Sequence, residues 1–197
     1  MMGMDKTASH EMPSAIVLAP HGIYVPTRDL IIFINKSIIE HRKTHGQEDP
    51  FGVRDWAELD YLCYKLHNHR YRDGAYLANA IHVSSEILYY IACGHPFLEG
   101  NKTTAFSAAI TMLEINLKMY AGPRLGKAYK LWKPSGNEAA AEGRTMEIIA
   151  SWGEGSDRGP LKELLIQKGI IGKRAREPLE GDVKKFIKLF LREYIIE

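Results

Sequence analysis

The side chains best suited to chemistry are gathered in residues 95–105, which read HPFLEGNKTTA. His95 can exchange a proton near neutral pH, because imidazole is the side chain that titrates in that range. Glu99 supplies a hard carboxylate oxygen, the kind of ligand that Mg²⁺ takes when it also holds phosphate. Lys102 adds a mobile positive charge. A base, a metal ligand and a cation in one short segment together favour phosphoryl or nucleotidyl transfer.

A Gly-Asn pair, Gly100 and Asn101, stands directly before a segment with a helical pattern. The first turn of a helix offers unpaired N–H groups and the positive end of the macrodipole, so it attracts anions. Glycine lets the backbone approach a phosphate closely. A P-loop is excluded, because five residues separate Gly94 from Gly100 and Asn101 lies between Gly100 and Lys102. The element predicted before the motif is also a helix and not a strand.

Each of these residues has a simpler structural explanation when it is taken alone. A single histidine at the end of a helix more often caps or hydrogen-bonds than catalyses. A glutamate near the start of a helix commonly just complements the macrodipole. The functional interpretation therefore depends on the combination of residues.

The motif lies between two predicted helices that must hold it in place. The first opens at Asp73, is apolar over a wide arc and stops at Gly94. The second runs from Thr103 or Thr104 to about Met119, and its inward positions are mostly small, which lets two helices approach closely. Two long buried helices joined by a short loop form an antiparallel hairpin at the centre of the domain.

Periodicity in the rest of the chain predicts an all-α fold. Thr27 is a good N-cap, and the helix after it, ending at Gly46, carries one stripe of inward residues: Leu30, Ile31, Ile34, Ile38 and His41. Further helices are predicted over Asp55–His67, Ala139–Trp152, Pro160–Lys168 and Asp182–Tyr194. We expect residues 1–20 to be a loose leader with a short extended piece at Ala15–Leu18, and residues 21–197 to be a single helical domain.

Composition excludes several classes of protein. The chain has 197 residues, 45% of them hydrophobic and 25% charged, which are ordinary globular values. Its net charge of +2 gives no strong field toward nucleic acid, so no direct nucleic-acid binding is expected. No apolar run is long enough to span a membrane. Cys63 and Cys93 have no metal-site spacing and suggest a reducing, cytoplasmic setting.

Taken together, HPFLEGNKTTA resembles the signature of the Fic/Doc family, HPFx[D/E]GN[G/K]Rx, which implies a compact helical bundle with the motif loop between two central helices. The residues that agree are His95, Pro96, Phe97, Gly100, Asn101 and Lys102, with Glu99 at the acidic position. Lys102, followed by Thr104 and Ala105, is similar to the death-on-curing branch. Phe51–Asp55, FGVRD, is similar to the family's GG[IV]RD flap segment. The resemblance covers residues 24–120 well and residues 121–180 only loosely.

The resemblance implies a role for each residue of the motif. His95 is the general base that deprotonates a hydroxyl of a target protein. Phe97 is a buried structural anchor of the loop, and Glu99 binds Mg²⁺. The phosphates of the nucleotide bind a pocket made by Gly100, Asn101, Lys102 and Thr103. The target-binding flap, which holds the target segment in extended form, consists of Gly52, Val53 and Arg54.

The implied activity is that of a nucleotide-dependent protein-modifying transferase, of adenylyltransferase or kinase type. It uses ATP or another nucleotide with Mg²⁺ and moves AMP or phosphate to a target hydroxyl. The resemblance also implies that the protein is the toxin of a toxin–antitoxin pair. Because the family's inhibitory motif, [S/T]xxxE[G/N], has no full match in the chain, we expect an antitoxin protein as regulator.

One departure from the signature bears on activity. Thr103 stands where the family has an arginine. Thr cannot replace the charge or the bidentate fork with which arginine grips phosphate. The alternative is therefore a catalytically impaired nucleotide-binding or protein-interaction module on the same fold. Lys102, or an arginine from elsewhere such as Arg54, is the candidate to compensate.

Overall fold

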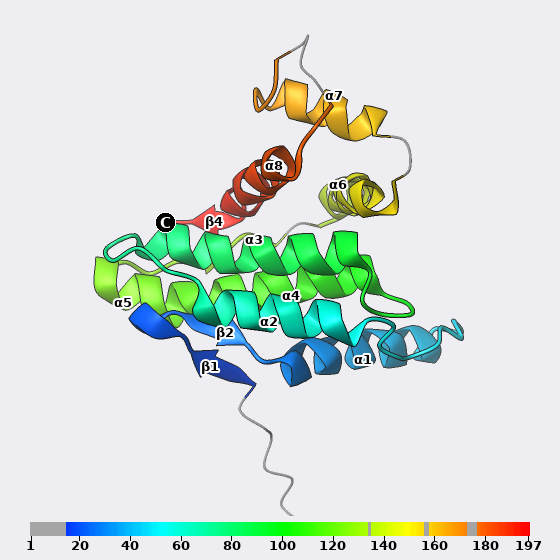
Figure 1. The fold of residues 1–197 in the computed structure, drawn as a ribbon, viewed down its shortest axis with the longest axis horizontal. Helices are drawn as coiled ribbons and strands as arrows, with labels where there is room; N and C mark the ends of the chain where they lie inside the picture. The colour runs from blue at the N-terminus through cyan, green and yellow to red at the C-terminus, as the bar shows by residue number, and fades with distance from the viewer. Residues whose placement is uncertain (1–14, 134, 156–157, 173–176) are drawn as a thin grey trace, which may run out of the picture.

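The computed structural model describes residues 15–133, 135–155, 158–172 and 177–197. Over these ranges the regular structure is almost entirely helical, which confirms the predicted all-α class (Figure 1). The main helices are α1 (Arg28–Thr44), α2 (Trp56–Asn68), α3 (Tyr76–Gly94), α4 (Asn101–Asn116), α6 (Asn137–Glu154), α7 (Gly159–Gln167) and α8 (Glu180–Arg192). The strands form two small antiparallel pairs: β1 (Ile16–Leu18) with β2 (Tyr24–Pro26), and β3 (Lys130–Leu131) with β4 (Ile195–Ile196).

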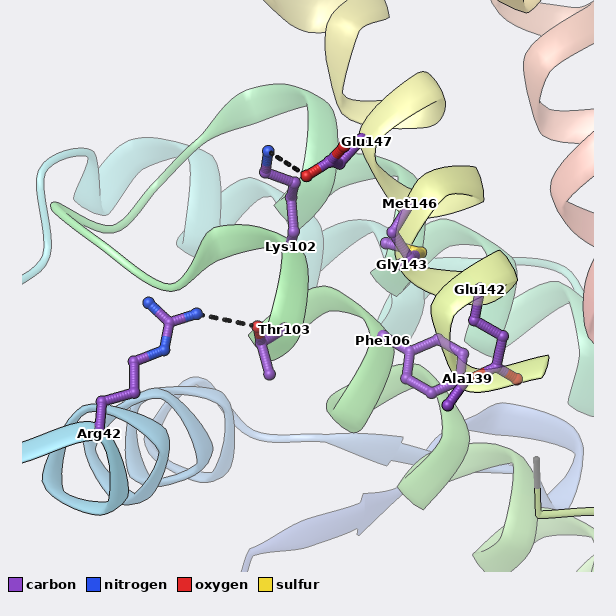
Figure 2. A pocket seen from close by; sticks show the side chains of 9 residues that line it. All are labelled: Arg42, Lys102, Thr103, Phe106, Ala139, Glu142, Gly143, Met146 and Glu147. Carbon is purple, nitrogen blue, oxygen red and sulfur yellow. Dashed lines mark hydrogen bonds and ion pairs between the residues drawn. The ribbon is translucent and has the colours of Figure 1, made fainter. Parts of the chain in front are cut away.

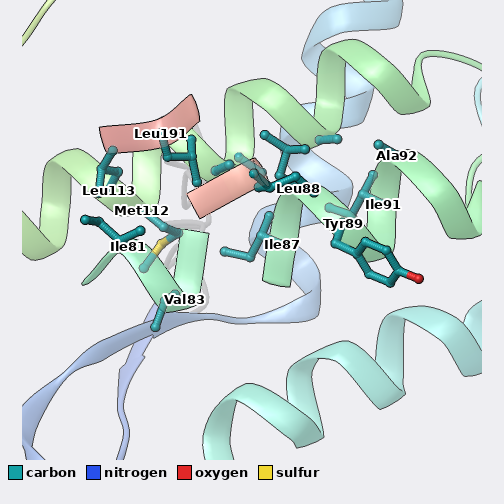
Figure 3. Close-up of a cluster of buried hydrophobic side chains, with 14 of the residues drawn as sticks. Ile81, Val83, Ile87, Leu88, Tyr89, Ile91, Ala92, Met112, Leu113 and Leu191 are labelled. Atoms are coloured by element: carbon teal, nitrogen blue, oxygen red, sulfur yellow. The ribbon is translucent and has the colours of Figure 1, made fainter. Parts of the chain in front are cut away.

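The predicted central hairpin is present. Helices α3 and α4 lie side by side in the middle of the molecule, with α1, α2 and the β1–β2 pair on one side and α6, α7 and α8 on the other (Figure 1). Helix α4 presents Ala105, Ala108 and Ala109, all fully or almost fully buried, and such small side chains let the two helices approach closely. Figure 3 shows how side chains of α3 interdigitate with Met112 and Leu113 of α4 and with α8.

The helix starts follow from their capping residues. The Thr27 hydroxyl accepts a hydrogen bond from the Leu30 N–H at 3.3 Å, and the Asp55 carboxylate accepts one from the Glu58 N–H at 3.0 Å. Both side chains satisfy a first-turn amide that has no partner inside its own helix. The predicted beginnings of α1 and α2 are therefore confirmed.

The predicted inward stripe of α1 is confirmed in part: Ile31 is buried, and Leu30 and Ile34 pack partly buried against the core. The fully buried positions are Ile31, Asn35 and Ile39, whereas His41 is exposed and Ile38 is only half-buried. The centre of the buried face is thus a polar residue. Asn35 is fully buried and makes hydrogen bonds to the motif loop, so hydropathy gives no sign that it faces inward.

The helices that flank the motif agree with prediction at one end and differ at others. Helix α3 ends at Gly94, as predicted, but it begins at Tyr76 and not at Asp73, and the residue in the left-handed conformation is His95, with φ of 51°. Gly94 instead gives room for the Glu58 side chain, since a Cβ there would lie 2.8 Å from the Glu58 Oε1 atom. Helix α4 begins at Asn101, earlier than predicted, and a π-helical turn (Leu117–Ala121) continues it into α5 (Gly122–Leu125).

The extended piece expected near Ala15–Leu18 is strand β1, and the rest of the leader predicted over residues 1–20 lies largely outside the described residues. β1 pairs with β2, and Ala19 is buried, so the described part of that leader packs on the domain. The Asn116 side chain of α4 holds this hairpin by hydrogen bonds with the N–H and the carbonyl of Tyr24, at 2.9 and 2.8 Å.

A buried carboxylate joins α3 to two neighbouring helices. Glu86 is 3% exposed and lies 2.8 Å from the Lys65 ammonium of α2 and 3.1 Å from the Lys184 ammonium of α8. Burial by itself raises the pKa of Glu86, but the two lysines hold it below its usual value. Removing one partner of such a network is costly, because a buried charge is left uncompensated.

Among the described helices, none is long and apolar enough to cross a membrane.

We predict that His82 of α3 makes the fold sensitive to mild acid. Burial, aided by the neighbouring His69, lowers the pKa of His82 to about 4, and its Nε2 atom has no hydrogen-bond partner. The unfolded chain therefore binds a proton at His82 more readily than the folded chain. The free energy of unfolding falls as the pH drops below the ordinary pKa of histidine. Linkage gives a loss of about 2 kcal/mol in the free energy of unfolding between pH 7 and pH 5.

Urea titrations at both pH values measure this loss. His82→Gln should flatten the difference, while His67→Gln on the exposed face of α2 should leave it unchanged. An equal pH dependence in the His82 variant would contradict the assignment.

Candidate functional site

The motif loop between α3 and α4 is closed by one side chain. The Asn101 amide accepts a hydrogen bond from the Phe97 N–H and donates one to the Phe97 carbonyl, both at 2.9 Å. We call this pair of bonds the Asn101 clasp. The Phe97 ring is fully buried, as expected of a structural anchor. These two bonds use the Asn101 side-chain amide. For the predicted contact with phosphate, Asn101 therefore offers its backbone N–H, which lies in the first turn of α4.

The predicted flap lies directly against the motif loop. Val53 and Phe97 form an antiparallel bridge. The Leu98 N–H donates to the Gly52 carbonyl at 3.0 Å, and the Arg54 N–H donates to the Pro96 carbonyl at 2.7 Å. In this pairing pattern the N–H and carbonyl of Val53 point away from the loop, toward the open edge of the flap. The Arg54 guanidinium also donates to the His95 carbonyl, so that side chain serves the loop itself.

Asn35 supports the loop from α1 and was missed at the sequence level. Its Nδ2 atom donates to the Glu99 carbonyl at 2.9 Å and to the Thr104 hydroxyl at 3.0 Å. Gly100 follows with φ of 78°, and a Cβ there would lie 3.1 Å from the same Nδ2 atom. The glycine is therefore needed both for its backbone angle and for the close approach of Asn35. Hydropathy gives no signal for Asn35, because a polar side chain is expected on the exposed face of a helix.

His95 ends α3 with its side chain 18% exposed. Its Nε2 atom is buried and lies 3.5 Å from the Glu154 Oε1 atom at the end of α6. At this distance the two side chains form no hydrogen bond, so Nε2 has no hydrogen-bond partner. Glu154 was also missed at the sequence level, because nothing in the local sequence connects α6 with the motif.

A close backbone contact holds Glu154 beside His95. Gly153 of α6 packs so tightly on the end of α3 that a Cβ there would lie only 1.8 Å from the Cys93 carbonyl oxygen. The Cys93 thiol also donates to the Ile149 carbonyl at 3.4 Å. Any side chain at position 153 would therefore push α6 away from the motif.

The predicted metal ligand and cation face solvent. Glu99 is exposed, and Lys102 lies 4.0 Å from the Glu147 carboxylate of α6. The described residues contain no group of three or more histidine, cysteine or acidic side chains that could hold a metal by itself. A single carboxylate does suit Mg²⁺ that arrives with phosphate, because this ion keeps several waters and binds through one or two carboxylates.

Thr103, the departure from the signature, contacts an arginine from another helix. The Arg42 guanidinium of α1 donates to the Thr103 hydroxyl at 3.1 Å and pairs with the Asp49 carboxylate at 2.9 Å. Arg54, the arginine suggested from the sequence, is committed to the His95 carbonyl.

A cavity of about 350 Å³ adjoins this end of the motif (Figure 2). Its wall consists of Arg42, of Lys102, Thr103 and Phe106 from α4, and of α6 between Ala139 and Glu147. In this wall the Lys102 ammonium points toward Glu147 and the Arg42 guanidinium toward Thr103, while Phe106 and Met146 supply apolar surface (Figure 2). This volume lies within the range of small-molecule sites, which combine apolar walls with a few polar groups.

Residues 25–113 match the model of the Fic/DOC family. This Fic/DOC segment runs from β2 to the later turns of α4 and includes the flap, the motif loop, Asn35 and Arg42. Helix α6, with Glu154 and one wall of the cavity, lies outside the match. No curated protein and no solved structure matches the chain.

The buried anchor of the motif loop gives a stability prediction. Phe97→Ala removes a fully buried ring and should lower the free energy of unfolding by about 3–5 kcal/mol. Leu98→Ala is the matched control, because the neighbouring side chain is 46% exposed, and it should cost far less. Chemical denaturation measures both. Equal losses for the two variants would show that the ring does not hold the loop.

Proposed function

We propose that the protein is a Fic/DOC-type transferase that moves phosphate or AMP from a nucleotide to a hydroxyl of a target protein. One observation carries the proposal. A single clasped loop in the Fic/DOC segment lies against the flap and carries His95 and Glu99, and the first turn of α4 that follows it borders a cavity of about 350 Å³ through Lys102 and Thr103. A base, an anion-binding helix start and a place for the acceptor therefore meet in one location.

His95 acts as the base in this proposal. Its imidazole takes the proton of the acceptor hydroxyl while the hydroxyl oxygen forms a bond to phosphorus. The bond from phosphorus to the leaving group breaks, releasing pyrophosphate when AMP is moved or the nucleoside diphosphate when phosphate is moved. The Glu154 carboxylate, 3.5 Å from Nε2, would stabilise the positive charge that the imidazole then carries. A positioned base contributes about 10²–10⁴-fold to such a step.

Mg²⁺ fits as a companion of the nucleotide. Glu99 would supply one carboxylate oxygen, and the remaining ligands would be phosphate oxygens and water. When bound, the ion neutralises charge on the transferring phosphate. The start of α4 lies next to Glu99 in the chain, and its residues Gly100, Lys102 and Thr103 would face the same phosphates.

The flap supports a protein substrate. Its edge toward the motif loop is already paired, and Val53 offers an N–H and a carbonyl on the other edge. An extended target segment can add to such an edge by main-chain hydrogen bonds. We place the acceptor side chain of that segment over His95.

Lys102, followed by Thr104 and Ala105, favours phosphate transfer and the death-on-curing branch. That branch in turn favours a toxin role and an antitoxin partner.

The second candidate function is a catalytically impaired nucleotide-binding or protein-interaction module. Thr103 favours it, because the motif itself carries no arginine. Incubating a cell lysate with the protein and ATP labelled at the α- or the γ-phosphate separates these cases. Label from the γ-phosphate alone indicates phosphate transfer, label from the α-phosphate indicates AMP transfer, and unlabelled protein favours the impaired module.

The base gives the prediction for this function. His95→Asn should reduce transfer at least 100-fold while nucleotide affinity stays within a few fold, because the base acts on the acceptor. Asparagine is chosen because it tolerates the left-handed backbone at this position. His67→Asn on the exposed face of α2 is the control and should transfer normally. Undiminished transfer by the His95 variant would remove this residue from the mechanism.

A further inference from the structure

We infer that Arg42, near the end of α1, binds the phosphates of the nucleotide. It supplies the guanidinium that the motif lacks because Thr103 stands at the position of the signature's arginine. The inference rests on the proposed function and names a phosphate-binding residue outside the signature. The ligand class is a nucleoside di- or triphosphate.

The position of Arg42 is the first support. Its Nη2 atom donates to the Thr103 hydroxyl at 3.1 Å, so a guanidinium lies beside the position where the signature has an arginine. Arg42 and Lys102 both border the cavity of about 350 Å³ (Figure 2). Short, uncharged Thr103 leaves room for this approach, whereas an arginine there would bring two guanidinium groups together.

The hydrogen bonds of Arg42 are the second support. The Nη1 atom pairs with the Asp49 carboxylate at 2.9 Å while Nη2 contacts Thr103. These two contacts, made by different nitrogens, restrain the guanidinium, and the Arg42 side chain is only 30% exposed. Guanidinium has five donors, so donors remain for phosphate. A preorganised planar fork matches phosphate bidentately and loses little side-chain freedom on binding.

Other cations near the motif are less suited to the role. Arg54 donates to the His95 carbonyl and does not border the cavity. Lys102 borders it, but an ammonium is a point charge without a fork, and Glu147 lies 4.0 Å away. Among the described residues that line this cavity, Arg42 is the sole arginine.

Calorimetric titration with Mg²⁺–ATP, and separately with adenosine, tests the inference. Arg42→Gln should weaken Mg²⁺–ATP binding at least tenfold and leave adenosine binding within twofold, because only the phosphates contact the guanidinium. Lys43→Gln is the matched control: this exposed cation is the next residue on α1 and does not border the cavity. The exchange variant Arg42→Thr with Thr103→Arg should recover Mg²⁺–ATP affinity to within about threefold of wild type. Thermal melts verify that each variant is folded.

The outcomes separate the inference from the proposed function. If Arg42→Gln binds Mg²⁺–ATP as tightly as wild type, or weakens adenosine equally, Arg42 is not the phosphate ligand, while the transferase proposal stands. If the exchange variant folds but recovers nothing, the effect of Arg42 is structural and the inference is overturned. If wild type binds no Mg²⁺–ATP although it is folded, the nucleotide site and the transferase proposal fall together.

Discussion

The Asn101 clasp is the constraint on which the candidate site depends. Two hydrogen bonds from one side chain close the loop that joins the central helices, and they set where α4 begins. With the Phe97 ring buried beneath it, the loop holds His95 at the end of α3 and Glu99 before α4. The same loop pairs with the flap through the bridge of Val53 and Phe97. Each hydrogen bond of this kind contributes about 1 kcal/mol, so the clasp and the buried ring act together to fix one geometry.

Chemical groups from outside the motif complete the site. Asn35 of α1 holds the Glu99 carbonyl, Arg42 reaches Thr103 from the same helix, and Glu154 of α6 approaches the His95 ring. Helix α6 is brought there by the contact between Gly153 and the Cys93 carbonyl. The motif therefore fixes the backbone of the site, and helices α1 and α6 add polar and charged side chains to it.

Much of the fold is predictable from local rules. Capping by Thr27 and Asp55, and the small residues of α4, are properties of a few neighbouring positions, and they predicted the starts of α1 and α2 and the central hairpin correctly. The burial of Asn35 could not be predicted from hydropathy, because its hydrogen-bond partners lie more than 60 positions away along the chain. Arg42 and Glu154 were missed for the same reason: long-range polar contacts leave no periodic trace. The predicted end of α3 at Gly94 is confirmed, although the left-handed residue that follows the helix is His95 and Gly94 itself serves packing against Glu58.

The most direct measurement is a crystal structure of the protein with Mg²⁺ and a non-hydrolysable ATP analogue. We expect the phosphates within hydrogen-bonding distance of the Arg42 guanidinium and of the first-turn amides of α4, with Mg²⁺ on Glu99 and the nucleoside in the cavity beside Phe106. Nucleotide bound elsewhere on the molecule, with the loop at Gly100 to Thr103 empty, would contradict the assignment of this loop as the nucleotide site.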